Sequence, residues 1–402
     1  MTEGRILFVT GPGGDGTSTL AAATALAAAR GGDAVSTLLL SREPAGRLAA
    51  LLGQAPPAWP EPPADVVPGL QASRIDPGAT FRTGLLAAQR WAAPALDALG
   101  ATTLDDDELT ELPGATEFAV LRALREAAQA GRWDLIVADL PAAAEAVRLL
   151  ALPEQLRRYL RRLLPGERQT ARALRPMLAQ LMGVPLPAQS LFEAADRWDG
   201  ALAVLQELVQ GPGAAVRLVA EPTARSAAVL RASLAGLALH GLAVEGLVAG
   251  RMVPAEGAGA WGAELAARQR AVLGELTAAT ERLPLLAELP HLGGEVDAAL
   301  LPRLAALLPP PGPPRRAVPE LEDRLRAEGL LLWHLPLPGA VKAELGLVRR
   351  GDELLVTTGP FRRALALPAV LRRCDVTGAR LADDGTLTVR FTPDESRWPA
   401  RS

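Results

Sequence analysis

The chain has 402 residues, 49% of them hydrophobic and 22% charged, so it can fold into one large globular domain and a smaller one. Its net charge of -3 provides no basic field for nucleic acid, and one cysteine with three scattered histidines argues against disulfides and metal sites. No apolar run reaches the roughly 18 to 20 residues that span a bilayer, and no signal-like segment opens the chain, so we expect a cytoplasmic protein that is not integral to a membrane.

Short apolar runs alternate with longer Ala- and Leu-rich stretches up to about residue 307. This alternation is typical of parallel sheets covered by helices, and it predicts a doubly wound α/β fold over residues 1–307. The expected core strands are Arg5–Thr10, Val35–Ser41, Leu135–Asp139, Val216–Glu221, Val244–Ala249 and Leu283–Leu289. One helix is expected over Ser18–Arg30, and another runs from its capping residue Thr223 to His240, which should lie on the surface.

The first expected strand leads into the glycine-rich loop Gly11-Pro12-Gly13-Gly14-Asp15-Gly16-Thr17-Ser18-Thr19. A strand, a glycine-rich turn and a helix N-terminus present backbone N–H groups to anions, which is typical of phosphate-binding loops. Taken alone, the loop also fits the G-x-G-x-x-G pattern of dinucleotide-binding domains. The glycines therefore indicate a nucleotide site without deciding its class.

Residues 153–198 have mainly helical character, and we interpret them as a helical insertion. Four apolar residues lie there on overlapping turns, namely Met177, Leu178, Leu181 and Met182. They would form either a groove for a hydrophobic client or ordinary core packing, since methionine adapts to varied apolar surfaces. Residues 308–320 form a proline-rich linker. Alternating strands and tight turns after it predict a small β-sandwich over residues 321–402.

The glycine loop resembles the deviant Walker A motif G-K-G-G-V-G-K-[ST]-[ST] of the ArsA-type arsenite-pump ATPases and the related tail-anchored-protein targeting ATPases. Further segments resemble motifs of that family in the same order. They are Glu43-Pro44-Ala45 at the first switch, Ile75-Asp76-Pro77, Asp139 and Arg148–Pro153 around the second switch, and Val248–Pro254 near the base site. Because five ordered similarities are far more specific than one glycine loop, the nicotinamide-binding interpretation is set aside.

The C-terminal residues resemble a second family. The segments Gly351–Val356, Phe361–Pro368 and Asp384–Val389 are similar to the α-crystallin domain of small heat-shock proteins, which some ArsA-like proteins carry at this end. Such sandwiches bind extended segments through sheet edges, so this resemblance implies interaction and not catalysis.

The departures from the ArsA family fall on its chemistry. Pro12 and Thr17 stand where the family places its two loop lysines, and Lys342 is the only lysine of the chain. Ala50 stands where the resemblance puts a catalytic aspartate of the first switch, and Asp15 adds a carboxylate that should repel a triphosphate. Because phosphoryl transfer depends on neutralising charge, we expect no catalytic residues and weakened binding of ATP or ADP with magnesium.

The resemblance leaves a set of vestigial nucleotide-binding residues, namely Gly11, Gly13, Gly14, Gly16, Ser18, Thr19, Asp139 and Arg251. Several have a simpler interpretation. Asp139 is either a magnesium-linked acid or a cap for the following turn, and Ser18 and Thr19 either contact phosphate or cap a helix. Arg42 and Arg47 would either replace the lost charge or be solvated. Gly250 stands in the place of the family's adenine-binding asparagine.

These residues predict a pseudo-ATPase that serves as a binding, chaperone-like or regulatory subunit. The resemblance implies a homodimer, or a heterodimer with a catalytically competent paralogue, and a hydrophobic polypeptide client. The alternative is a slow ATP hydrolase that couples nucleotide state to protein targeting or anion transport. A single cysteine, Cys374, argues against an arsenite pump, because thiolate ligation of arsenic needs several.

Overall fold

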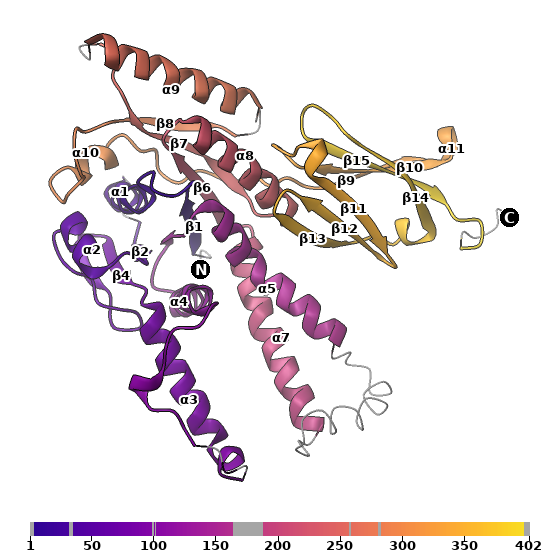
Figure 1. The fold of residues 1–402 in the computed structure, drawn as a ribbon, viewed down its shortest axis with the longest axis horizontal. Coiled ribbons are helices and arrows are strands. Elements are labelled where there is room, and N and C mark those ends of the chain that lie inside the picture. Colours follow the sequence, from indigo (N-terminus) through magenta and orange to yellow (C-terminus); the bar gives the residue numbers. More distant parts are fainter. Residues whose placement is uncertain are drawn as a thin grey trace.

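The computed structural model describes residues 4–31, 35–98, 100, 102–163, 188–256, 259–279 and 283–397. Its largest element is an eight-stranded sheet in the order β3-β4-β2-β5-β1-β6-β7-β8 (Figure 1). The strands are β1 (Arg5–Thr10), β2 (Thr37–Ser41), β3 (Ala64–Val67), β4 (Leu70–Arg74), β5 (Leu135–Asp139), β6 (Ala214–Ala220), β7 (Val244–Met252) and β8 (Leu285–Pro290). Every neighbouring pair is parallel except the edge pair β3 and β4. The predicted α/β class is therefore confirmed.

Helices cover both faces of this sheet. One face carries α1 (Thr17–Arg30), α2 (Ala45–Leu52) and α10 (Leu301–Ala305). The other carries α4 (Ala115–Ala130), α5 (Ala143–Leu163), α7 (Ala188–Gln210), α8 (Ala224–Leu239) and α9 (Gly259–Ala279). Successive side chains of β1 point to opposite faces of the sheet, because side chains alternate along a strand. Phe8 belongs to one hydrophobic cluster, whereas Leu7 and Val9 belong to the other.

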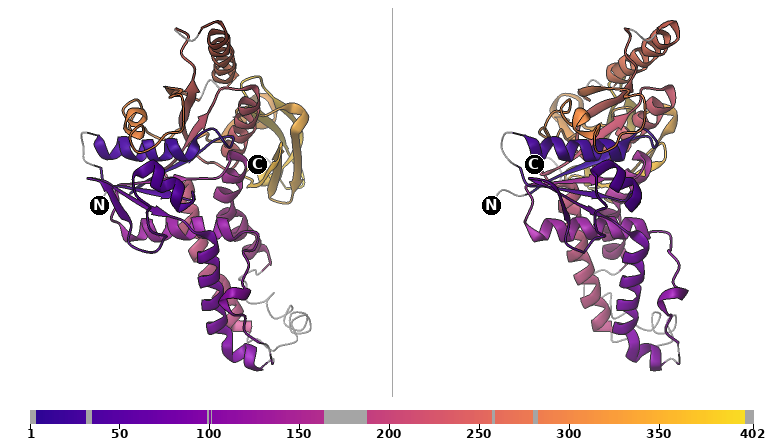
Figure 2. Two further views of the ribbon diagram at one scale, coloured as in Figure 1. Left: turned by 60° about the vertical axis from the view of Figure 1, so that its left-hand side comes forward. Right: turned by 90° about the vertical axis from the view of Figure 1, so that its left-hand side faces the viewer.

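Three long helices extend beyond the sheet to the same side, as Figures 1 and 2 show. We call α3 (Pro77–Ala98), α5 and α7 the helical arm. Asp76 starts α3 by accepting a hydrogen bond from the N–H of Ala79 at 2.9 Å. Helix α5 begins at Ala143 and continues through the buried Pro153, so residue 153 is not the start of a helical segment. Met177, Leu178, Leu181 and Met182 lie outside the described residues.

The C-terminal region contains two antiparallel sheets, in the orders β14-β15-β10-β9 and β11-β12-β13. Their strands are β9 (Glu320–Arg324), β10 (Leu330–Pro336), β11 (Leu345–Arg350), β12 (Glu353–Thr358), β13 (Phe361–Ala366), β14 (Cys374–Leu381) and β15 (Thr386–Pro393). The short helical turns of this region are α11 (Leu325–Glu328), η2 (Lys342–Glu344) and η3 (Leu371–Arg373). A further short turn, η1 (Asp106–Glu108), lies between α3 and α4 in the α/β part. Every second residue of β10 is buried, namely Leu331, Trp333 and Leu335, as expected for a strand with one buried face.

The C-terminal sheets pack directly against the large α/β part. Trp333 and Phe361 belong to the same hydrophobic cluster as Leu234 of α8. Gly236 makes this approach close, because a Cβ atom there would lie 2.6 Å from the Phe361 ring. His240, at the end of α8, is only 2% exposed, so the prediction of a surface histidine is wrong. Burial, followed by the nearby charge of Arg363, lowers the pKa of His240 to about 4.

The proline-rich segment between these two parts is attached to the large sheet. Arg315 forms an isolated bridge with Val244 of β7. Arg217 of β6 and Glu245 of β7 form an ion pair at 2.8 Å, with side chains 0% and 2% exposed. The Arg217 guanidinium also donates to the carbonyl of Pro309, and the Glu245 carboxylate accepts from the N–H of Gly312. The linker thus completes the polar contacts of a buried charge pair.

Candidate functional site

The backbone of the glycine loop requires its glycines. A Cβ atom on the buried Gly11 would collide with the carbonyl oxygen of Val219 on β6. Gly13, Gly14 and Gly16 have φ angles of 101°, 81° and 81°, a left-handed conformation that strains other residues. The loop therefore keeps the turn that its sequence predicts.

This turn leaves backbone donors available beside a helix N-terminus. Within the described part of the chain, the N–H groups of Gly13, Gly14 and Gly16 donate no hydrogen bond. Helix α1 begins at Thr17 with Gly16 as its N-cap and no side-chain cap. Ser18 and Thr19 therefore lie within the first turn, and the expectation that they cap the helix is wrong. By backbone geometry alone, the loop suits an anion.

Carboxylates occupy the space in front of the first turn of α1. The Ser18 hydroxyl donates to Oε1 of Glu43 at 2.8 Å. Next to them, Ser41 at the end of β2 donates to Oδ2 of Asp139 at 2.6 Å. Burial raises the pKa of Asp139 to about 6, and hydrogen bonds from Ser41 and Ser18 oppose that rise. Asp139 bonds across to the neighbouring strand, so the expectation that it caps the following turn is wrong.

Positive charge near the loop is sparse and mostly engaged. Thr17 supplies only a hydroxyl at the start of α1. Arg47, on α2, approaches Glu43 at 3.4 Å and Glu295 at 4.0 Å, so it is paired and not simply solvated. Arg42 differs, because its Nε atom is buried and has no hydrogen-bond partner among the described residues. Its charge acts on Asp139, where it lowers the pKa.

Asp15 turns away from the phosphate cradle toward the next loop of the sheet. Its Oδ2 accepts hydrogen bonds from the N–H of Glu221 at 3.1 Å and from the hydroxyl of Ser226 at 2.9 Å. Thr223 caps α8 by accepting from the N–H of Ser226 at 3.1 Å, as predicted. Asp15 therefore also ties the glycine loop to the start of α8, a role that its position in the motif does not indicate.

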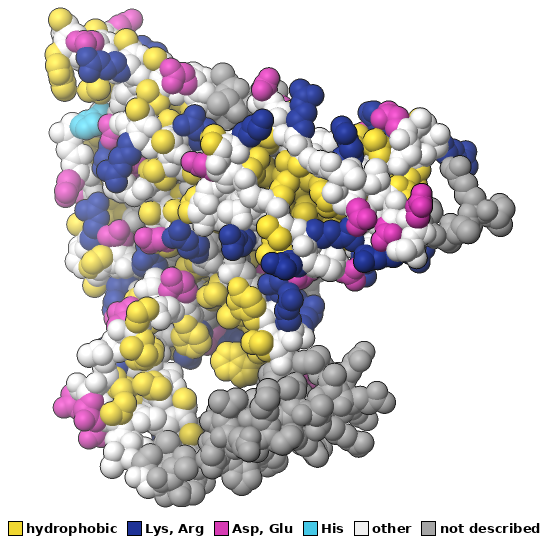
Figure 3. All heavy atoms as spheres, turned by 45° about the vertical axis from the view of Figure 1, so that its right-hand side comes forward, with side chains coloured by type: hydrophobic (Ala, Val, Ile, Leu, Met, Phe, Trp, Pro, Cys, Tyr) yellow, Lys and Arg dark blue, Asp and Glu magenta, His cyan; other side chains and the backbone are white. Residues whose placement is uncertain are grey.

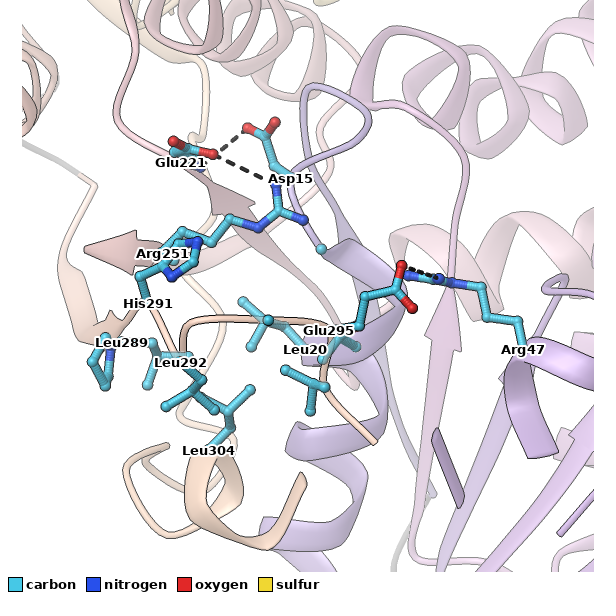
Figure 4. A pocket seen from close by; sticks show the side chains of 16 residues that line it. Asp15, Leu20, Arg47, Glu221, Arg251, Leu289, His291, Leu292, Glu295 and Leu304 are labelled. Carbon is cyan, nitrogen blue, oxygen red and sulfur yellow. Dashed lines mark hydrogen bonds and ion pairs between the residues drawn. The ribbon is translucent and has the colours of Figure 1, made fainter. Parts of the chain in front are cut away.

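A pocket of about 420 Å³ lies beside the loop, between the first turn of α1 and the segment that follows β8 (Figure 4). Arg251, on β7, has a φ of 54° and donates from Nη1 to the carbonyl of Gly14 at 3.0 Å. Gly250 lines the same pocket. Apolar walls come from side chains such as Leu20 and Leu289. The structure thus places Arg251 next to the glycine loop.

The charge around this pocket does not favour a triphosphate. Three carboxylates line it, namely Asp15, Glu221 and Glu295, against the two guanidiniums of Arg47 and Arg251. Arg251 is itself 3.5 Å from the Glu221 carboxylate. The apolar walls suit a flat uncharged group, but the site as a whole does not fit ATP with magnesium.

The three positions where the resemblance would place charged residues lie in the glycine loop, at the start of α1 and on α2. Pro12 is half-buried in the loop, and Thr17 opens α1. Ala50 is exposed on α2, where its carbonyl accepts from the N–H of Ala298. None of the three side chains offers a charge or an acid.

Two residues at the site carry no motif signal of their own. Ser41 is the last residue of an expected strand, and its hydroxyl is the closest partner of Asp139. His291 lines the pocket after β8. A general rule could have indicated both, since residues at the carboxyl ends of parallel strands line the ligand crevice.

No group of three or more histidine, cysteine or acidic side chains in the described ranges is arranged to hold a metal ion. Among the same residues, no helix combines the length and apolar character needed to cross a bilayer. Cys374 lies buried in the C-terminal part, and burial raises the pKa of its thiol, so it is not a reactive thiolate.

Comparison with known proteins gives two family matches that together span most of the chain. Residues 4–308 match the family described as anion-transporting ATPase, and residues 329–391 match the HSP20-like domain found in ArsA. A Streptomyces coelicolor protein without an assigned function is 51% identical over 98% of this chain and 99% of its own. A Mycobacterium tuberculosis protein is 33% identical over 99% and 98%. An Aquifex aeolicus protein, named as an arsenical pump-driving ATPase, is 24% identical over 95% and 99%.

Proposed function

This chain belongs to the family of anion-transporting ATPases, and on that premise we propose that it is a member that binds partners without hydrolysing ATP. One observation carries the proposal. Thr17 opens α1 where the resemblance would place a phosphate-binding lysine, and the adjacent Ser18 hydroxyl donates to Glu43 at 2.8 Å. A carboxylate therefore sits where a hydrolase needs positive charge.

The physical argument is one of charge. A transferring phosphoryl group gains negative charge on its oxygens, and catalysis depends on cations placed beforehand to neutralise it. Here the first turn of α1 faces Glu43 and the buried Asp139, which oppose that charge. No other alignment of the loop sequence with the motif would place a lysine there, because Lys342, in the C-terminal part, is the only lysine of the chain. The loss should lower turnover by several orders of magnitude.

A phosphate-release assay with ATP and magnesium tests this proposal, alongside calorimetric titration with ATP and ADP. We expect no release above the protein-free background. Thr17→Lys serves as a matched variant, and it should strengthen ATP binding because it returns one charge to the cradle. Steady release by the unaltered protein, lost in Asp139→Ala, would overturn the proposal.

That last outcome would establish the alternative, a slow ATP hydrolase. One observation favours it, namely the Nε of Arg42, which is buried near Asp139 without a hydrogen-bond partner among the described residues. An arginine beside the loop could supply part of the missing charge. Arg42→Gln separates the two functions, because it should abolish slow release in the alternative and leave release at the background level in a non-hydrolysing protein.

The partner in this proposal is a hydrophobic polypeptide segment, held by the helical arm of a dimeric protein. Large apolar side chains project from α5 and α7, and Figure 3 shows hydrophobic side chains exposed on this part of the surface. Leu163 is 72% exposed and Trp198 is 61% exposed. A contiguous apolar patch is typical of an interaction surface, and the proposal is that these side chains form part of one.

A light-scattering assay on an aggregating client protein tests this second step. Leu163→Gln with Trp198→Gln should reduce the suppression of aggregation. Trp261→Gln is the matched control, because Trp261 is 76% exposed on α9, outside the arm. Equal effects of both changes would argue against a role for the arm. Sedimentation analysis at several concentrations tests whether the protein is a dimer.

A further inference from the structure

A second cleft, distinct from the glycine-loop site, lies where the helical arm meets the C-terminal sheets. Its volume is about 960 Å³, and its walls come from α5, α7, the end of α8, the linker and strands β12 and β13. Basic side chains gather at this junction, as Figure 3 shows in dark blue. Six arginines line the cleft, namely Arg157, Arg158, Arg161, Arg162, Arg316 and Arg363.

The arginines of α5 outnumber their acidic partners. Arg157 and Arg161 share Asp199 of α7, at 3.1 and 3.2 Å. Likewise, Arg158 and Arg162 share Glu353 of β12, at 2.7 and 3.3 Å. Each carboxylate thus faces two guanidiniums, and in each pair the more distant arginine is more than 60% exposed at its side chain. These exposed guanidiniums remain free to bind a further anion.

The remaining charges leave the cleft positive. Arg316 of the linker donates to the backbone carbonyls of Gln210 and Gly211, and it has no carboxylate partner among the described residues. Arg363 pairs with Glu154 at 2.8 Å, and Glu207 also lines the cleft. Six guanidiniums against four carboxylates leave an excess of two positive charges.

A histidine at the wall of the cleft has one buried ring nitrogen without a partner. His240 lines the cleft and is 2% exposed, yet its Nδ1 has no hydrogen-bond partner among the described residues. Buried polar atoms are nearly always paired, so an unpaired one calls for an explanation. Because the Nδ1 atom is inaccessible to solvent, a ligand in the cleft would not contact it directly, and the arginines alone argue for a ligand.

We propose that this cleft binds a small polyanion that carries two or more phosphate or carboxylate groups and bridges the helical arm to the C-terminal sheets. The guanidinium forks suit these groups, because phosphate and carboxylate accept two parallel hydrogen bonds from arginine. A single inorganic phosphate would fill only a small part of the volume. The proposal is independent of whether the glycine loop binds nucleotide.

Calorimetric titration of the full chain with tripolyphosphate and, separately, with citrate tests the binding and distinguishes the two chemistries. Arg161→Gln with Arg162→Gln should weaken the binding by about tenfold or more, because the two changes remove charge-assisted hydrogen bonds to the anion. Arg157 and Arg158 still pair with Asp199 and Glu353, so the fold is retained. The matched control is Arg268→Gln with Arg270→Gln, which removes the same charge from exposed positions on α9.

The NMR signals of the three histidines can show where on the protein the anion binds. His240 lies in this cleft, His291 lies in the glycine-loop pocket and His334 lies on β10. In a histidine-resolved NMR spectrum, tripolyphosphate or citrate should shift the His240 resonances and leave those of His291 and His334 in place. Shifts at His291 alone, an absence of binding, or equal weakening by the control variant would each overturn the proposal.

Discussion

Replacing Arg217 by methionine should destabilise this protein strongly, because the change leaves a buried carboxylate without its counter-charge. The Nε and Nη2 atoms of Arg217 donate to the two oxygens of Glu245, each at 2.8 Å. The same guanidinium donates to the hydroxyl of Thr24 on α1 at 3.2 Å and to the carbonyl of Pro309 at 3.4 Å. One side chain therefore connects two strands, the helix that follows the glycine loop, and the linker.

The expected cost follows from the burial of both partners. Removing one member of a buried ion pair costs roughly 3 to 5 kcal/mol, which is a large share of the roughly 5 to 15 kcal/mol that stabilises a domain. Urea unfolding followed by far-UV circular dichroism measures this loss as a lower midpoint. The transition should remain single, because one hydrophobic cluster joins the α/β part to the C-terminal sheets.

A second variant separates the effect of the unpaired buried charge on stability from the effect of lost packing. Arg217→Met with Glu245→Leu removes both charges and should recover most of the lost stability, although the N–H of Gly312 loses its acceptor. Arg268→Gln on the exposed face of α9 should stay within about 0.5 kcal/mol of the unaltered protein. A loss below about 1 kcal/mol in Arg217→Met would refute the reasoning.

Two further predictions concern Asp139 and Gly236. Burial raises the pKa of Asp139 to about 6, so the folded chain keeps a proton on this carboxyl that the unfolded chain releases near pH 4. The protonated carboxyl therefore costs no stability at low pH, and stability falls as the pH rises from about 4 through 6. Asp139→Asn should therefore be neutral at pH 4 and stabilise the protein by about 2 to 3 kcal/mol at pH 7.5 in urea unfolding, and equal effects at both pH values would contradict this. Gly236→Ala should cost about 1 to 3 kcal/mol in urea unfolding through its clash with Phe361. Gly274→Ala on α9, where a Cβ would meet no atom outside its own stretch of helix within 4 Å, should be neutral or stabilising.

The sequence predicts the α/β fold well, because alternation of apolar runs depends on local composition. The strands β1, β5 and β7 begin at the expected residues. Helix α1 begins at Thr17, next to its expected start at Ser18. The edge strand β3 and its neighbour β4 are not predicted, since both are short and β4 is placed by its pairing with β2, which no local pattern encodes.

The candidate site is predictable in its backbone and not in its side-chain partners. Glycine spacing fixes the turn, so the expected positions of Gly13, Gly14 and Gly16 follow directly. The directions of Ser18, Asp15 and Asp139 do not follow, because each is set by a residue far away in the chain, namely Glu43, Ser226 and Ser41. His240 illustrates the same limit, since the helix end on which it lies is covered by the C-terminal sheets.

The linker has a consequence for how the two parts of this protein can be exchanged during evolution. Pro309 and Gly312 provide backbone partners to the buried pair of Arg217 and Glu245. A recombination that fused the α/β part to a different C-terminal domain just after Leu308 would remove both partners from a charge pair inside the sheet. The two parts are therefore not interchangeable modules, and they should be inherited together.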